Sequence, residues 1–176
     1  FLYKFTKKVI ALSQGVKDNI VTRYKVKREK IEVIYNPIDL EQIEKSIQNG
    51  TIDEKHKHIF NNNEKVIVSA GRLVDDKDQQ TLIKAFARVR EKVKAKLIIL
   101  GEGELESKLK QVAKELGVQE HVYFLGFQQN PYIYFANADV FVLTSKREGF
   151  GHVLAEALAV GVPIVSTKAK PGAIEV

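Results

Sequence analysis

The chain has 176 residues, of which 44% are hydrophobic and 28% charged, so it can form one domain with a buried core, and collagen-like or disordered classes are excluded. It contains no cysteine, which excludes disulfides, thiolate metal sites and cysteine nucleophiles. Its long apolar run, which includes residues 158–165, is far shorter than the roughly 18 residues of a membrane-spanning helix. The net charge of +6 arises from basic residues mixed with acidic ones, without the clustering typical of nucleic-acid binding, so we expect no nucleic-acid partner.

The pattern of the first 65 residues predicts a small structural unit followed by a linker or surface loop. Residues 9–12 and 31–35 have the apolar, β-branched character of strands, and residues 16–24 between them have helical spacing. Residues 46–65 are polar and lack sustained periodicity, so we interpret them as a linker or surface loop, with His56 and His58 on the surface. Residues 1–45 are then the end of a preceding domain with its interdomain segment. Because the sequence opens on Phe1 and contains no methionine, we expect a fragment cut from a longer chain.

From residue 66 onward, short apolar strands alternate with amphipathic helices. This alternation predicts a Rossmann-like, doubly wound parallel sheet at residues 66–176 and an α/β fold class. The expected strands are 66–70, 97–100, 122–125, 140–143 and 163–166, and the expected helices are 82–93, 105–116, 131–135 and 153–159. Ligands of such sheets bind outside the carboxyl ends of the strands, so the segments after the strands are the candidate site.

The segment after the first of these strands carries two cations. Gly71 allows a close backbone approach, and Arg72 and Lys77 stand beside the start of a helix, an arrangement that suits a diphosphate. The alternative is that the two cations only neutralise the neighbouring aspartates on a solvated loop. Asp76 and Asp78 form an Asp-x-Asp pattern, but the lysine between them would repel a divalent ion, so we assign no metal.

The segment after strand 140–143 combines glycines with a helix start. Glu148-Gly149-Phe150-Gly151-His152 leads directly into the helix, so its backbone amides form a candidate anion site that includes a possible phosphate contact at His152. Glu156 follows Glu148 by eight positions, and both carboxylates can face one crevice. The alternative is that Glu156 is a solvated helix residue, but its apolar neighbours favour a polar ligand instead.

Gly101-Glu102-Gly103 follows strand 97–100 and resembles the start of a dinucleotide-binding motif. Glu106 stands where the third glycine belongs, so a tight turn is the better interpretation and a nicotinamide dehydrogenase is disfavoured. A nucleophile elbow is also missing.

Taken together, these segments resemble the group 1 retaining glycosyltransferases. The resemblance rests on Gly71-Arg72 with Lys77, on Gly101-Glu102-Gly103, on Glu148-Gly149-Phe150-Gly151 with Glu156, on Asn36-Pro37-Ile38-Asp39, and on Gly161-Val162-Pro163 followed by Gly172-x-x-Glu175. It implies the C-terminal half of a GT-B glycosyltransferase, in which a second Rossmann-like domain binds a nucleotide-diphosphate-sugar and the acceptor-side domain precedes it.

The resemblance also implies roles for single residues. Arg72 and Lys77 hold the diphosphate and stabilise the leaving nucleotide, the amides around Phe150, Gly151 and His152 hold the same phosphates, Glu148 contacts the sugar, and Glu156 binds the ribose. Glu148, Arg72 and Lys77 are thus the expected catalytic residues, with neither metal nor cofactor. Two departures from the family pattern are Asp78 in place of glycine and the polar His152.

The implied activity is retaining transfer of a hexosyl-type sugar to a glycan or lipid-linked acceptor in polysaccharide or lipopolysaccharide biosynthesis. The acceptor would bind mainly to the preceding domain, so we expect no turnover from this sequence alone. The implied location is cytoplasmic, with peripheral association at the inner membrane face as an option. UDP is one candidate nucleotide, while base, sugar and acceptor stay open. The alternatives are a non-catalytic nucleotide or nucleotide-sugar binding module and an anionic-surface binder built on Lys4, Lys7 and Lys8.

Overall fold

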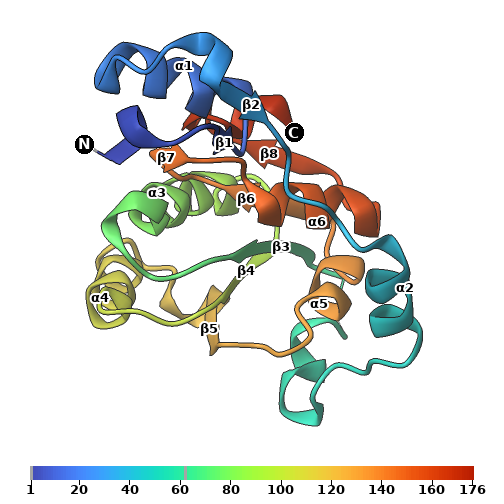
Figure 1. The fold of residues 1–176 in the computed structure, drawn as a ribbon. Helices are drawn as coiled ribbons and strands as arrows, with labels where there is room; N and C mark the ends of the chain where they lie inside the picture. Colours follow the sequence, from blue (N-terminus) through green and yellow to red (C-terminus); the bar gives the residue numbers. More distant parts are fainter. Residues whose placement is uncertain (1, 62) are drawn as a thin grey trace.

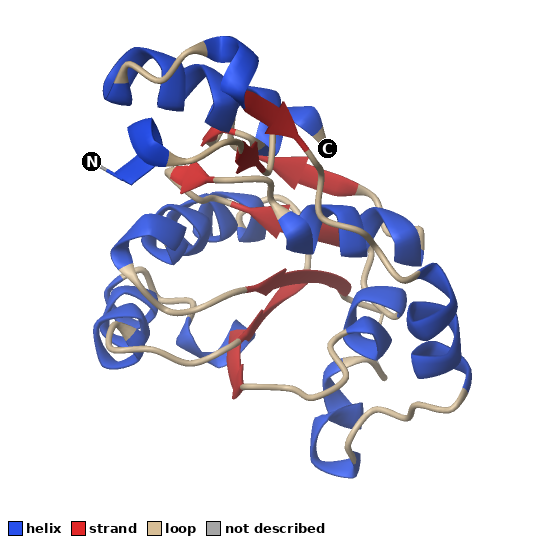
Figure 2. Ribbon diagram, in the orientation of Figure 1, coloured by secondary structure: helices blue, strands red, loops and turns tan. Residues whose placement is uncertain are grey.

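The computed structural model of the protein describes residues 2–61 and 63–176, and a five-stranded parallel sheet with the strand order β5-β4-β3-β6-β8 lies at its centre (Figure 1). The strands are β3 (Lys65–Ala70), β4 (Ala95–Leu100), β5 (Val122–Gly126), β6 (Val140–Leu143) and β8 (Ile164–Ser166). Helices α3 (Gln79–Arg90) and α4 (Glu106–Glu115) cover one face, and α5 (Tyr132–Ala136) and α6 (His152–Val160) cover the other (Figure 2). The predicted Rossmann-like, doubly wound parallel sheet is confirmed.

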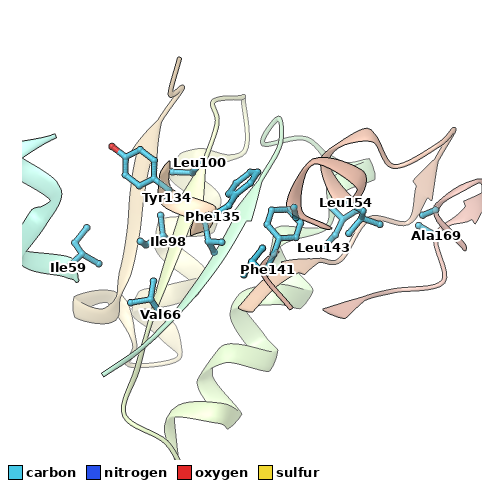
Figure 3. Packing of buried hydrophobic residues seen from close by; sticks show 14 residues of the cluster. Ile59, Val66, Ile98, Leu100, Tyr134, Phe135, Phe141, Leu143, Leu154 and Ala169 are labelled. Atoms are coloured by element: carbon cyan, nitrogen blue, oxygen red, sulfur yellow. The ribbon is translucent and has the colours of Figure 1, made fainter. Parts of the chain in front are cut away.

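Strand β4 shows why both faces need helices. All its residues are buried, with Leu97 and Ile99 packed in the cluster that contains α3 and α4, and Ile98 and Leu100 in the opposite cluster. Figure 3 shows Ile98 and Leu100 near Tyr134 and Phe135 of α5. Alternate residues of a strand point to opposite faces, so a continuous apolar run is suited only to a sheet that is covered on both sides.

The order of the strands creates a crevice between β3 and β6. The chain leaves β3 through α3 toward β4 and β5, whereas it leaves β6 through α6 toward β8 on the other side. The two connections therefore diverge from neighbouring carboxyl ends, and such a switch point is where open α/β sheets bind ligands. The segments after β3 and β6 are thereby brought side by side.

The N-terminal unit has a separate small core. The parallel pair β1 (Val9–Ala11) and β2 (Ile31–Val33) packs with α1 (Gln14–Tyr24). A further parallel pair, β7 (Arg147–Glu148) and β9 (Lys170–Pro171), was not predicted from sequence. It joins the loop after β6 to the C-terminal residues, which lie beside α1 and β2 (Figure 1).

The segment between the small unit and β3 contains structure that was not predicted. Helix α2 (Leu40–Gln48) packs against α5 and α6, and the 3-10 helix η3 (Glu54–Ile59) buries Ile59 in the main core. The expectation that His56 lies on the surface is wrong: it is 7% exposed, and its Nδ1 lies 2.8 Å from the Tyr134 hydroxyl. His58 is exposed, as predicted. The domain boundaries at residues 45 and 65 stay predictions.

Within the described residues, no helix has the length and apolar character that are needed to cross a bilayer.

Candidate functional site

A cavity of about 640 Å³ opens at the carboxyl edge of the sheet, within the size range of small-molecule sites. Its walls come from the segments that follow β3, β4, β5 and β6, from α5 and from the first turns of α6. The lining residues with polar, charged or aromatic side chains are Arg72, Lys77, Glu102, Phe127, Gln128, Phe135, Glu148, His152 and Glu156. The two sequence-predicted loops therefore share one cavity.

Lys77 and Glu148 form the ion pair that joins these loops. Lys77 Nζ lies 2.5 Å from Glu148 Oε1, and the two side chains are 21% and 12% exposed. Ser145 Oγ donates a second hydrogen bond to the same oxygen, at 2.7 Å. Partial burial weakens solvent screening, so the two charges compensate one another at the cavity wall. A ligand phosphate that pairs with Lys77 in place of Glu148 would leave the Glu148 carboxylate free to bind another group.

The alternative in which the loop aspartates neutralise Lys77 does not describe the structure. Asp75 pairs with Lys146 at 2.8 Å, and Asp76 pairs with Arg147 at 2.7 Å. The hydrogen bond from Lys146 holds the pKa of the Asp75 carboxyl below its ordinary value. These exposed pairs fasten the loop after β6 to the loop after β3, while Lys77 stays directed into the cavity.

Arg72 is the second cation of the cavity wall and is exposed. Its carbonyl oxygen accepts a hydrogen bond from Gln79 Nε2 at 2.9 Å, and Gln79 is 4% exposed at the start of α3. Among the described residues, Gln79 Oε1 is a buried atom without a hydrogen-bond partner. Gln79 thus orients the backbone of Arg72, and the exposed guanidinium can reach an anion in the cavity.

Glycines bring the loops after β3 and β4 close together. Gly71 N donates to Leu100 O at 3.0 Å, and a Cβ on Gly101 would lie 2.2 Å from Gly71 O. A Cβ on Gly103 would likewise lie 2.4 Å from Leu73 O. The interpretation of Gly101-Glu102-Gly103 as a tight turn agrees with this packing, because side chains there would separate the two loops.

Glu156 lies on α6 and is held at one oxygen. The Tyr132 hydroxyl donates to Glu156 Oε1 at 3.1 Å, and His152 Nε2 lies 3.6 Å from the same atom, one helical turn earlier. The Glu156 side chain is 19% exposed. Burial and the nearby carboxylate raise the pKa of Tyr132 to about 12. Glu156 is therefore a half-buried acceptor whose second oxygen is available to a ligand hydroxyl.

The remaining predicted residues lie at the start of α6. Gly151 is the N-cap residue of α6, with φ of +81°, which favours glycine. The Phe150 ring packs against Tyr35, with centroids 5.7 Å apart. Neither residue is among those that line the cavity, whereas His152 and Val153 are. The structure thus brings Gly71, Arg72, Lys77, Glu148, His152 and Glu156 together around the cavity, whereas Phe150 and Gly151 lie outside its lining.

Three supporting residues were not predicted from sequence: Ser145, Gln79 and Tyr132. Ser145 lies three residues before Glu148 in the loop after β6, and this short spacing was the available signal. Gln79 and Tyr132 act across the fold, so no local pattern identifies them.

Comparisons with known proteins agree with this architecture. Residues 51–176 match the family described as "Glycosyl transferases group 1", and residues 1–42 match "Glycosyltransferase Family 4". The N-acetylgalactosamine-N,N'-diacetylbacillosaminyl-diphospho-undecaprenol 4-alpha-N-acetylgalactosaminyltransferase of Campylobacter jejuni is 38% identical over 175 residues, covering 99% of this chain and 45% of the relative. An uncharacterized glycosyltransferase of Methanocaldococcus jannaschii is 34% identical over 177 residues, covering 100% of this chain and 43% of the relative.

Among solved structures, Anabaena HepE in complex with UDP-glucose superposes with a TM-score of 0.84 and 30% identity, covering 99% of this chain and 48% of that chain. The fold and the site define a Rossmann-like ligand-binding domain of the GT-B type. The chain belongs to the glycosyl transferases group 1 family. It spans less than half the length of these relatives.

Proposed function

We propose that the chain forms the donor-binding half of a retaining glycosyltransferase, which moves a sugar from a nucleotide-diphosphate-sugar to a glycan or lipid-linked acceptor. The observation that carries this proposal is one cavity, at the switch point of the sheet, which gathers Arg72 and Lys77 with Glu148 and Glu156. The UDP-glucose in the HepE complex supports a nucleotide-sugar as the ligand.

Arg72 and Lys77 are proposed to bind the donor diphosphate. Cleavage of a glycosyl phosphate bond develops negative charge on the departing nucleotide, and positioned cations stabilise that charge. Of the backbone amides around the start of α6, that of His152 belongs to a cavity-lining residue and adds a donor for the same phosphates, whereas Phe150 and Gly151 lie outside the lining. When the diphosphate replaces Glu148 as the partner of Lys77, the Glu148 carboxylate keeps its hydrogen bond from Ser145 and has a lone pair available for another group.

The two carboxylates are proposed to act on opposite ends of the donor. Glu148, released from Lys77, contacts the sugar near the oxocarbenium-like centre. Glu156, with Oε1 engaged by Tyr132, offers Oε2 to a ribose hydroxyl. A carboxylate that accepts a hydrogen bond from a hydroxyl in a half-buried site discriminates strongly against ligands that lack the hydroxyl.

We also propose that transfer needs no divalent metal. Two side-chain cations supply the charge that a metal would bring to the leaving group. Asp75 and Asp76, on the loop after β3, are engaged by Lys146 and Arg147, so they are poorly placed to hold an ion at the cavity.

The acceptor is proposed to bind mainly to the domain that precedes this chain in the family. A cytoplasmic location, with peripheral attachment to the inner face of the membrane, fits a lipid-linked acceptor and the basic surface that includes Lys7 and Lys8. A vesicle-flotation assay with anionic lipids, with and without salt, tests the attachment.

Transfer by the full-length protein tests the proposal as a whole. We expect an acceptor product whose anomeric configuration, measured by NMR, equals that of the donor sugar, at a rate that EDTA leaves unchanged. An inverted product would refute the retaining mechanism, and loss of activity with EDTA that magnesium restores would refute metal independence. Saturable donor binding without transfer to any acceptor would favour the non-catalytic binding module.

A further inference from the structure

Glu175 is not among the residues that line the cavity, and its carboxylate binds the start of α1. Glu175 Oε2 accepts a hydrogen bond from Gln14 N at 2.8 Å, and Oε1 accepts one from Gly15 N at 2.7 Å. These are the first two amides of α1, and the third, Val16 N, donates to the side chain of the N-cap residue Ser13 at 3.1 Å. Glu175 thus completes the cap of a helix that comes from a different part of the chain.

Close backbone packing surrounds this contact. A Cβ on Gly15 would lie 1.8 Å from Pro171 O, and a Cβ on Gly172 would lie 2.0 Å from Gly149 O. Only glycine permits these approaches. The start of α1, strand β9 and the loop after β6 therefore meet with backbone against backbone.

The same turn is bonded to Glu148 of the cavity. Gly172 N donates to the Glu148 carbonyl at 2.8 Å, and Gly172 O accepts from Glu175 N at 3.1 Å. Glu148 is also paired with Pro171 in the β7–β9 ladder. One 3-10 turn, η6 (Ala173–Glu175), thus connects the cap of α1 to the backbone of the cavity carboxylate.

Tyr35, which follows β2 in the N-terminal unit, contacts both Glu175 and the loop that contains Glu148. Its hydroxyl donates to Glu175 Oε2 at 3.1 Å, and its ring packs against Phe150, two residues after Glu148. The hydrogen bond to Glu175 raises the pKa of Tyr35. Burial opposes ionisation of Glu175, but the amides of Gly15 and Gln14 outweigh it and keep its pKa below the ordinary value.

We propose that Glu175 is a positioning residue, which sets the place of Glu148 in the cavity by tying strand β9 to the start of α1 and to Tyr35. This inference rests on the proposed function, in which Glu148 contacts the donor sugar. It makes the sugar end of the site depend on the N-terminal unit, whereas Arg72 and Glu156 at the nucleotide end have no part in the connection. The described contacts of Glu175 do not reach the cavity, so its effect passes through the turn that bonds the Glu148 backbone and through the contact of Tyr35 with Phe150.

The test uses the full-length protein with E175Q, with Y35F as a milder variant that keeps the ring against Phe150, and with E32Q as the control. Glu32 belongs to the same N-terminal unit, but it is exposed and pairs only loosely with Lys8, at 3.8 Å. Hydrogen–deuterium exchange is measured at residues 14–16 and 147–151. We expect exchange in both segments to rise about tenfold in E175Q, less in Y35F and not at all in E32Q.

Calorimetry with a nucleoside diphosphate and with its sugar conjugate supplies the second readout. We expect E175Q to weaken binding of the conjugate about tenfold and that of the diphosphate clearly less, because Arg72 and Lys77 still contact the phosphates, a split that general destabilisation would not produce. Unchanged exchange at 147–151, or equal weakening of both ligands, would overturn the positioning role. If the wild-type protein binds neither ligand, the proposed function fails, and exchange alone then decides whether Glu175 holds the loop.

Discussion

Replacement of Lys77 by alanine has two separable effects that follow from its ion pair. A charge-assisted hydrogen bond to a phosphate contributes about 1.5–3 kcal/mol, so K77A is expected to weaken nucleoside diphosphate binding by about 10- to 150-fold. The variant also leaves Glu148, whose side chain is 12% exposed, without its lysine. The loss of a buried partner costs about 3–5 kcal/mol, and because this pair retains some solvent we expect a loss of about 1–2 kcal/mol in unfolding free energy.

Two further variants separate binding from stability. The double variant K77A/E148Q removes the uncompensated carboxylate, so most of the stability should return while the affinity stays low. K146A is the matched control, because Lys146 pairs with Asp75 on the same two loops but lies outside the cavity. Calorimetric titration and urea unfolding measure the two effects. Wild-type affinity in K77A, or an equal loss in K146A, would refute the reasoning.

Further predictions concern the nucleoside end and the loop packing. E156Q should weaken nucleoside diphosphate binding about tenfold but leave pyrophosphate binding within about twofold, and equal losses in calorimetry would contradict a ribose contact. Tyr132 should ionise at about pH 12 in an absorbance titration. Because its pKa is raised, its contribution to stability is present below pH 10 and is lost as the pH rises through 12, and Y132F should abolish this step. G101A should lower the unfolding free energy by about 2 kcal/mol or more, because its Cβ would meet Gly71 O, while G149A, where the space is open, should change it little.

The sheet and the position of the site were predictable from local patterns. The β-branched runs of β3 and β6 predict strands, and the carboxyl ends of parallel strands predict where ligands bind. Gly71, Arg72 and Lys77 follow β3, and Glu148 follows β6, so their proximity follows once these strands are neighbours. The family resemblance adds roles to these residues, and the comparisons confirm the family.

The pairing of charges was not predictable, because several partners lie equally near in sequence. Lys77 is flanked by Asp76 and Asp78, yet its partner is Glu148 on the neighbouring loop. That choice depends on the side-by-side placement of the loops after β3 and β6. There Asp75 pairs with Lys146 and Asp76 pairs with Arg147. Local spacing contains no information on such cross-loop competition.

Helix α2 and the burial of His56 were not predicted, for two different reasons. Helix α2 had a local signal, since Asp39 caps it and Ile43 and Ile47 recur at helical spacing, but its polar surroundings concealed it. The burial of His56 had no local signal, because the hydroxyl that forms a hydrogen bond with its ring belongs to Tyr134, far along the chain. A polar segment packs into a core only when such a distant partner satisfies it.

Calorimetric titration of the wild-type protein with UDP, GDP and ADP, each with and without EDTA, tests the central claim most directly. The account predicts saturable binding of one base series, with an affinity that EDTA does not change. The absence of binding by any of the three nucleotides to the folded, full-length protein would contradict the assignment of this cavity to a nucleotide-sugar donor.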